Sequence, residues 1–280
     1  MKNTSPNQFS SLIEPSLFKK NGESTIVKGK YGYKRETFQI TLDTSPKFNR
    51  PQGKYTILTL SHILSPNKPE LAYYQEKLSQ AIKDYIPTLK KSDTVLIVGL
   101  GNRHISSDSL GTEVVKNIHI TPTKNTPKVC VFAPSVLGLT GIETADTISG
   151  ITTQIKPKLI IMIDSLCASN TDRLGTSFQI SNTPITPGSG INNPRKKIAQ
   201  NIHTISIGVP LVVYGNTFII SALEKCGLTP NNIHHPDIKT KIKALYSQPN
   251  TTLVTLNEID YIAKELGEII AHAINKALNI

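Results

Sequence analysis

The run that decides the fold is Val95–Leu100 (VLIVGL), a continuous apolar stretch that ends on the turn residues Gly101 and Asn102. A second run, Leu159–Ile163 (LIIMI), ends directly on Asp164. Continuous, largely β-branched runs of this length that alternate with helical segments are typical of buried strands in a parallel sheet. The sequence therefore predicts an α/β protein with a central, mostly parallel sheet flanked by helices.

An aspartate follows each of these two runs. Asp108 lies eight residues after the first run, and Asp164 comes immediately after the second. The carboxyl ends of parallel strands meet at one edge of a sheet, and open α/β sheets place their functional sites at that edge. We therefore expect both carboxylates to lie at the same edge.

Two neighbouring carboxyl groups have a characteristic chemistry, because they cannot both ionise comfortably and so share one proton. The ionised member can activate water while the protonated member polarises a carbonyl group. Asp108 is expected near a helix N-terminus, which favours its ionised form, and Asp164 after an apolar strand is the candidate for the protonated form. Spacing alone leaves structural roles open, a helix cap for Asp108 and a hydrogen bond to a loop for Asp164.

Composition indicates one domain. With 280 residues, 38% of them hydrophobic, the chain can bury a full core, and we expect a single α/β domain over residues 26–280. Residues 1–25, rich in Ser, Asn and Lys, are expected to form a flexible polar arm. The three cysteines are widely separated, which argues against disulfides and favours a reducing cytoplasm. No run is long enough to span a membrane, and no secretion signal is recognisable, so we expect no membrane partner.

The formal net charge is +11, from 31 Lys and Arg against 20 Asp and Glu. The basic residues are scattered along the chain, without interleaved aromatic residues. Scattered cations are more typical of a solvated surface than of a nucleic-acid footprint. We therefore expect no direct nucleic-acid site.

Periodicity predicts the remaining elements. Alternation of apolar and polar residues predicts strands at a partly exposed edge, and helical spacing predicts amphipathic helices. Residues 227–252 are polar and are expected to loop around a short helix. The expected strands are Thr37–Leu42, Lys54–Leu60, Val129–Ala133 and Ile205–Val213, and the expected helices are Leu71–Ile86, Asp108–Asn117 with Ser107 as its cap, Thr144–Ile155 and Asn257–Leu278.

Several known signatures are excluded by their chemistry. Gly99-Leu100-Gly101 lacks the third glycine of a dinucleotide loop, whose place is taken by His104. The stretch Pro187–Gly190 lacks the residues of a phosphate loop and the spacing of a nucleophile elbow. No His-Glu-x-x-His zinc motif occurs. Cys167 could act as a nucleophile only if a nearby base lowered its pKa, and we expect it to be a small buried residue.

Several blocks of the sequence recur in one order and spacing, and blocks in register are more specific than any one of them alone. They are Val98–Asn102, Asp108–Gly111, Pro134–Thr144, Ile163–Leu166, Gln179–Ser181 and Pro187–Gly190, followed by Leu256–Asp260 and Ile274–Leu278. Together they resemble the germination protease family of spore-forming bacteria. The resemblance covers roughly residues 36–222 and returns near the C-terminus.

This resemblance implies an endopeptidase that degrades small acid-soluble spore proteins during germination. It also implies a zymogen, a homotetramer in the spore core, no cofactor, and a fold similar to hydrogenase-maturation proteases (phosphorylase/hydrolase-like). The proposed catalytic aspartates of the family fall on Asp108 and Asp164.

Other residues are expected to support the pair. Gly101, Asn102 and the loop Gly188, Ser189, Gly190 would shape the cleft, with backbone N–H groups available to an oxyanion. Glu143 and Asp146 lie at a loop-helix junction, where they could orient the site or cap the helix, and Arg195 could contact an acidic substrate or lie in solvent.

The chain also departs from the family pattern. The Arg-Thr-Asp-Leu-Ala-like motif that precedes self-cleavage is not recognisable before Gly32, Asn182 stands where Asp is usual, and Tyr214 stands where the family has a carboxylate. Two alternatives stay open. One is a metal-dependent protease in which Asp108, Asp164 and a histidine such as His104 or His203 bind a transition metal. The other is a catalytically silent protein that binds spore proteins.

Overall fold

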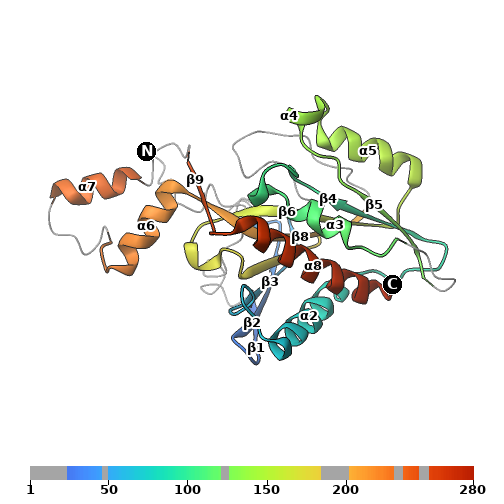
Figure 1. Cartoon of the computed structure of the whole chain (residues 1–280), viewed down its shortest axis with the longest axis horizontal. Helices are drawn as coiled ribbons and strands as arrows, with labels where there is room; N and C mark the ends of the chain where they lie inside the picture. The colour runs from blue at the N-terminus through green and yellow to red at the C-terminus, as the bar shows by residue number, and fades with distance from the viewer. Residues whose placement is uncertain (1–23, 46–49, 121–125, 184–201, 230–235, 246–251) are drawn as a thin grey trace.

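The computed structural model describes residues 24–45, 50–120, 126–183, 202–229, 236–245 and 252–280 (Figure 1). Within these residues the strands form one sheet in the order β1-β2-β3-β7-β8-β6-β4-β5, with β9 paired to β8. The strands are β1 (Ser24–Lys28), β2 (Tyr33–Ile40), β3 (Gly53–Leu60), β4 (Thr94–Gly99), β5 (Lys128–Phe132), β6 (Leu159–Ala168), β7 (Ser177–Ser181), β8 (His203–Tyr214) and β9 (Leu253–Thr255).

The helices are α2 (Lys68–Lys83), α3 (Leu110–Lys116), α4 (Leu137–Thr140), α5 (Thr144–Ile155), α6 (Gly215–Lys225), α7 (Pro236–Leu245) and α8 (Ile259–Leu278), with short 3-10 turns η4 (Ser106–Asp108) and η5 (Thr171–Arg173). Of these, α2, α3, α5 and α8 cover the faces of the sheet, whereas α7 contacts α6 and extends away from the sheet (Figure 1).

The predicted fold class is confirmed, since the centre of the sheet is parallel. The strands β8, β6, β4 and β5 run in one direction, and each connects to its neighbour through a register of parallel pairs. Their apolar runs are buried because helices cover both faces. Antiparallel strands β7, β3, β2 and β1 extend the sheet beyond β8.

Two helical layers enclose the core. On one face, α2, α3 and α8 bury the large apolar cluster that includes Leu78, Val114 and Ile270. On the other face, α5 packs through Ala145 and Ile148 against β4 and β6. Figure 1 shows α8 lying across the sheet, with α5 well apart from it. The terminal helix was predicted from its apolar stripe, and burial of that stripe is what holds it on the sheet.

The segment after β4 differs from the prediction. Instead of one helix from Asp108 to Asn117 capped by Ser107, the chain forms the turn η4 and then the shorter helix α3. No side chain caps either element: Ile105, before η4, has no polar side chain, and Ser109, before α3, donates its Oγ to the carbonyl of Ser106. The Asp108 carboxylate is also engaged elsewhere, as the site geometry shows.

Other differences concern the lengths and positions of strands. The strand that begins with the run Leu159–Ile163 does not end there but continues through Asp164 to Ala168, because β8 pairs with it along its whole length. The strand β3 is not at the edge, since β2 and β7 pair with it on both sides. The edge strand on this side of the described sheet is β1, which begins at Ser24, inside the segment expected to be a polar arm. The sequence prediction also missed β7, β9 and α6.

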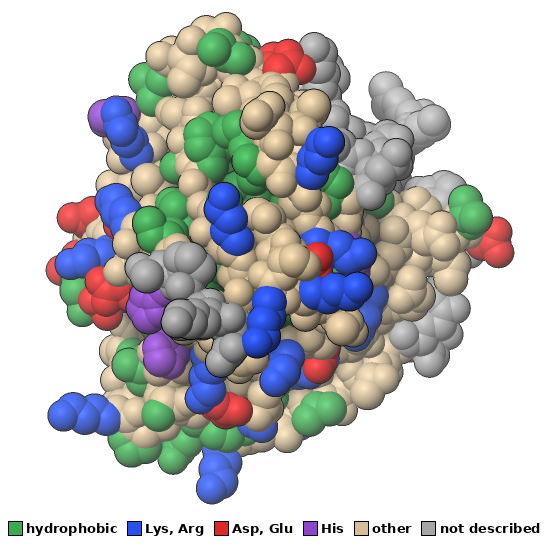
Figure 2. Space-filling model, turned by 90° about the vertical axis from the view of Figure 1, so that its right-hand side faces the viewer, with side chains coloured by type: hydrophobic (Ala, Val, Ile, Leu, Met, Phe, Trp, Pro, Cys, Tyr) green, Lys and Arg blue, Asp and Glu red, His purple; other side chains and the backbone are tan. Residues whose placement is uncertain are grey.

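The surface agrees with the scattered charge of the sequence. Figure 2 shows Lys and Arg side chains distributed over one face of the molecule, with acidic side chains between several of them. Among the described residues, no helix is both long and apolar enough to cross a membrane.

Candidate active site

The turn after β4 holds the first aspartate. Gly101 has φ +104°, and a Cβ atom at this position would lie 2.0 Å from the carbonyl oxygen of Asp108. Only glycine therefore allows the chain to approach so closely. The backbone N–H of Asn102 donates to Asp108 Oδ2 at 2.9 Å, and Asn102 Oδ1 accepts from the N–H of His104 at 2.9 Å. These two bonds fix the turn and the carboxylate together.

Two further glycines bring α3 against the end of β4. A Cβ atom at Gly99 would lie 2.1 Å from the carbonyl oxygen of Gly111, and one at Gly111 would lie 2.4 Å from that of Leu100. The start of α3 therefore touches the strand backbone, where no side chain fits. Asp108, two residues before α3, is held at the carboxyl end of β4 as a result.

The second aspartate lies at the same level of the sheet. Ile163 pairs with Gly99, the last residue of β4, and the N–H of Leu100 donates to the carbonyl of Ile163 at 2.8 Å. Asp164 is thus one residue beyond the end of β4, while Gly208 of β8 pairs with it on its other side. Since β4 ends at Gly99, no residue of β4 pairs with Asp164, and the chain turns away from the sheet at this point. Asp164 is partly buried there.

Electrostatics couples the two carboxyl groups. Burial raises the pKa of Asp164 well above its ordinary value, and the charge of Asp108 raises this pKa further. The N–H of Ser165 donates to the Asp164 carboxyl and opposes the shift in part. Both larger causes favour the protonated form of Asp164 at a pH where an ordinary aspartate is ionised.

Two residues beside the pair were missed by the sequence prediction. Ser165 Oγ is buried and, among the described residues, the only buried side-chain oxygen or nitrogen without a hydrogen-bond partner. At Gly208, a Cβ atom would lie 2.5 Å from Leu166 Cδ1, so a side chain there would crowd the strand that carries Asp164. A serine after an aspartate and a glycine within an apolar strand are weak signals in a single sequence.

The loop-helix junction lies at α5. Glu143 occupies the position before the first residue of α5, and its side chain makes no capping hydrogen bond. Asp146 is exposed in the first turn, where its charge is favourable to the helix dipole. Glu143 is therefore not the capping residue of α5. A capping role for Asp146 and an orienting role for either residue stay predictions.

The loop residues Gly188, Ser189 and Gly190, together with Arg195, lie outside the described residues.

The histidines considered for a metal site lie apart from the pair or face solvent. His104 is exposed, and its Nε2 accepts from Arg103 Nε at 3.2 Å. His203 begins β8 opposite Leu159, five residues and so about 16 Å along the strand from the level of Asp164. Its Nε2 lies 2.9 Å from the carbonyl oxygen of Tyr85. In the described part of the chain, no three His, Cys, Asp or Glu side chains are grouped as metal ligands.

Cys167 is buried, and burial raises the pKa of its thiol to about 12. A thiol in this environment is protonated at neutral pH and is a poor nucleophile. Its expected role as a small core residue is confirmed by its burial.

Comparisons with known proteins converge on one family. The family model described as "Germination protease" matches residues 20–225. The germination protease of Caldanaerobacter subterraneus subsp. tengcongensis is 31% identical over 92% of this chain and 88% of its own length, and that of Clostridium acetobutylicum is 32% identical over 83% and 80%. The germination protease of Bacillus subtilis is 36% identical over 65% of this chain and 54% of its own length. Among solved structures, the NiFe hydrogenase maturation protease HycI from Thermococcus kodakarensis overlaps 70% of this chain and 99% of its own, with 16% identity and a TM-score of 0.39.

Proposed function

This chain belongs to the germination protease family, and from that premise we propose that it is an endopeptidase in which Asp108 and Asp164 together activate water against a peptide bond. The observation that carries the proposal is the coupling of the two carboxyl groups at one edge of the sheet, where the charge of Asp108 raises the pKa of Asp164. Perturbed acids that lie beside one another are candidates for catalysis.

The environments of the two groups assign their roles. Asp108 accepts a hydrogen bond from the N–H of Asn102, which favours the carboxylate, so it is the group that takes a proton from the attacking water. Asp164 is held in its protonated form by burial and by the charge of Asp108, so it donates to the carbonyl oxygen of the scissile bond. The tetrahedral intermediate then breaks when the leaving nitrogen receives the proton that Asp108 accepted, and the hydroxyl formed from the carbonyl oxygen returns its proton to Asp164 as the C=O bond re-forms.

Asn102 contributes differently from what the sequence suggests. Its backbone N–H is taken by Asp108 Oδ2, so it orients the carboxylate and is not available to an oxyanion. Gly101 serves the same end, because its missing side chain lets the turn close on Asp108.

The substrates that we propose are small acid-soluble spore proteins, cut in the spore core as germination begins. Relatives that carry the name germination protease support this assignment. The zymogen and the homotetramer implied by the family resemblance stay predictions.

The proposal is tested by incubating the purified chain with a small acid-soluble spore protein and following the intact mass of the substrate over time. The matched variants are Asp108→Asn, Asp164→Asn and, as a control, Asp237→Asn at an exposed position of α7. We expect discrete fragments from the parent and the control alone. Fragments produced at the parental rate by either of the first two variants, shown to be folded, would refute the proposal.

The same assay addresses the two alternatives. Protein purified without a histidine tag is assayed with and without a chelator, and a loss of cleavage that added metal restores would indicate the metal-dependent mechanism. Bound but uncut substrate in the parental sample would indicate the silent binding protein.

A further inference from the structure

A groove lies between the hairpin β1–β2 and the helix α2, at the opposite end of the sheet from β4 and β5. Its volume is about 450 Å³. The strands contribute Val27, Lys28 and Arg35, and the helix contributes Tyr73 and Lys77. Nothing in the proposed water activation uses these residues.

The charge of the groove is positive. Lys28, Arg35 and Lys77 line it, and none of its lining residues is acidic. Arg35 forms an ion pair with Asp84 at 2.6 Å. Neither Lys28 nor Lys77 has an ion pair with any carboxylate in the described part of the chain, and Lys77 Nζ lies 5.5 Å from the centre of the Tyr73 ring. Lys77 Nζ also donates to the neutral amide oxygen of Gln80 at 3.2 Å, so the charges of Lys28 and Lys77 are available to an acidic partner.

The groove borders one edge of the described sheet. Among the described strands, β1 pairs with β2 alone, so no described strand pairs with its other edge. Val27 in this strand is 49% exposed and Ile26 is 42% exposed. A peptide that pairs with such an edge is extended, and every second side chain points to the same face. If a peptide pairs with β1 in this way, every second side chain of the peptide lies over the groove, beside Val27.

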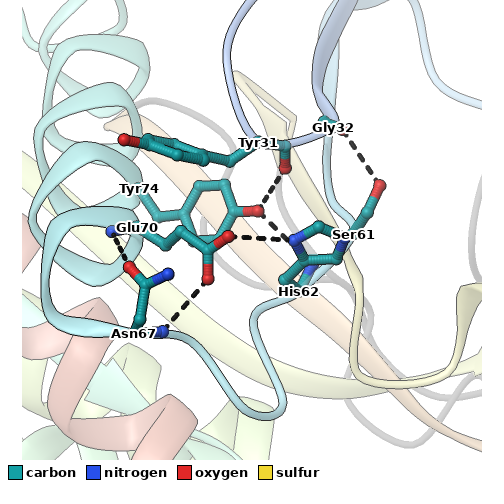
Figure 3. A network of polar contacts seen from close by, with 7 residues as sticks. All are labelled: Tyr31, Gly32, Ser61, His62, Asn67, Glu70 and Tyr74. Atoms are coloured by element: carbon teal, nitrogen blue, oxygen red, sulfur yellow. Dashed lines mark hydrogen bonds and ion pairs between the residues drawn. The ribbon is translucent and has the colours of Figure 1, made fainter.

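Local contacts hold the groove in shape. Gly29 leaves room for the Tyr73 hydroxyl, since a Cβ atom there would lie 2.2 Å from it. The hairpin residues Tyr31 and Gly32 have positive φ angles, and their carbonyls accept hydrogen bonds from Tyr74 Oη and Ser61 Oγ (Figure 3). The hairpin is thus tied both to α2 and to the segment that follows β3.

The start of α2 is anchored in the same network. Asn67 Oδ1 accepts from the N–H of Glu70, and Glu70 accepts from the N–H of Asn67, which is a reciprocal capping box (Figure 3). His62 Nδ1 lies 3.1 Å from Glu70 Oε1. Because both walls of the groove are already held in place, little conformational entropy is lost from the protein when a ligand binds, and this favours affinity.

We propose that this groove binds an extended, acidic segment of the protein substrate, with Asp or Glu at alternate positions opposite Lys28 and Lys77. Residues 1–23 of the chain carry three Lys and two Glu and so lack the acidic character that this segment needs. The inference rests on the proposed function only in assigning the segment to the substrate.

The topology sets the distance between the groove and the aspartate pair. A peptide paired with the outer edge of β1 lies six strand spacings from β6, across β1-β2-β3-β7-β8, or about 29 Å. An extended chain covers that distance in about nine residues. The acidic segment would therefore lie at least about nine residues from the bond that is cut, and the groove would lower KM with little effect on kcat.

Binding is measured on the Asp164→Asn variant, so that cleavage does not interfere. The probe is a fluorescein-labelled peptide of alternating Thr and Glu, and its matched control has Gln in place of Glu. In fluorescence anisotropy we expect the Glu peptide to bind, the Gln peptide to bind at least fivefold more weakly, and the double variant Lys28→Gln/Lys77→Gln to lose about fivefold in affinity, the size expected of two exposed ion pairs. The control variant Lys128→Gln/Lys158→Gln removes two exposed lysines near the β5 end of the sheet and should bind as the parent does.

Equal affinity for both peptides, or equal loss in both lysine variants, would overturn the inference, since attraction to the whole basic surface would then explain binding. Concentration-dependent self-association that disappears in Lys28→Gln/Lys77→Gln and is not displaced by the peptide would overturn it in favour of a second copy of this chain. Because the assay needs no turnover, a failure of the aspartate mechanism leaves its outcome unchanged, and a failure of peptide binding leaves the aspartate mechanism intact.

Discussion

Replacing Gly101 by Ala tests how the turn after β4 supports the site. A Cβ atom there would lie 2.0 Å from the carbonyl oxygen of Asp108, whereas ordinary contact begins at 3.4 Å, so the turn must open by about 1.4 Å. A φ of +104° is also unfavourable for alanine, by about 1–3 kcal/mol. Forced backbone shifts in packed regions cost about 1–3 kcal/mol more. We therefore expect the free energy of unfolding to fall by about 4 kcal/mol.

Activity should fall as well, because the displaced residue carries a catalytic group in the proposed mechanism. A misplacement of about 1 Å costs on the order of 100-fold in rate. The assay combines urea denaturation with kcat/KM on a spore-protein substrate. Two further glycines separate the causes of the loss. Gly141 has φ +69° but nothing within 4 Å of a Cβ atom, and Gly150, inside α5, has neither a positive φ nor a close neighbour.

The three alanine variants should form a graded series. Gly150→Ala should stabilise the protein by about 0.5–1 kcal/mol, since alanine is the better helix former. Gly141→Ala should cost about 1–2 kcal/mol from its backbone conformation alone. A cost for Gly101→Ala no greater than that for Gly141→Ala would refute the steric argument. Parental activity in a destabilised Gly101→Ala would refute the link between this turn and catalysis.

Three further predictions follow from single side chains. Because the folded-state pKa of Asp164 is raised, the native state binds more protons than the unfolded state between pH 3.8 and that raised pKa, and its stability falls as pH rises through this window. Asp164→Asn should therefore be more stable than the parent at neutral pH, with a difference in Tm that vanishes below about pH 4; an equal Tm at both pH values would contradict the shift. Cys167, whose thiol pKa is raised to about 12, should resist iodoacetamide at pH 8 while exposed Cys226 is alkylated, as peptide mass mapping would show; rapid alkylation of both would be inconsistent with its burial. Ser165→Ala should be neutral or stabilising by about 1 kcal/mol in urea denaturation, because no described residue hydrogen-bonds to its buried hydroxyl, whereas Ser206→Ala removes a hydroxyl that donates to a backbone carbonyl and should cost about 1–2 kcal/mol; equal losses would point to a partner of Ser165 outside the described residues.

The central strands and the terminal helix can be predicted from the sequence because several independent patterns indicate each of them. The run Leu159–Ile163 is apolar on both faces, and only a strand covered by helices on both sides satisfies it. The stripe along α8 is as clear, since its apolar residues repeat at helical spacing over 20 residues. Long periodic segments of this kind carry enough buried area to override local preferences.

The missed elements lack such redundancy. The exposed strand β1 has no buried face to leave a pattern, and β9 has three residues. The turn η4 forms where a helix was expected because the Asp108 carboxylate bonds to Asn102, a choice that depends on the tight approach at Gly101. The sequence placed both aspartates at one edge, but the step between β4 and β6, which brings Asp164 beside the turn, depends on strand register and is not visible in a single sequence.

The central claim is that the two aspartates act as one unit, and a double-mutant comparison tests it most directly. The measurement is kcat/KM for one spore-protein substrate with the parent, Asp108→Asn, Asp164→Asn and the double variant, each shown to be folded. Groups that act as a unit are non-additive, so we expect each single variant to lose about 1,000-fold or more and the double variant to lose little beyond the worse single one. A single variant within tenfold of the parent, or losses that multiply in the double variant, would contradict the shared role of Asp108 and Asp164.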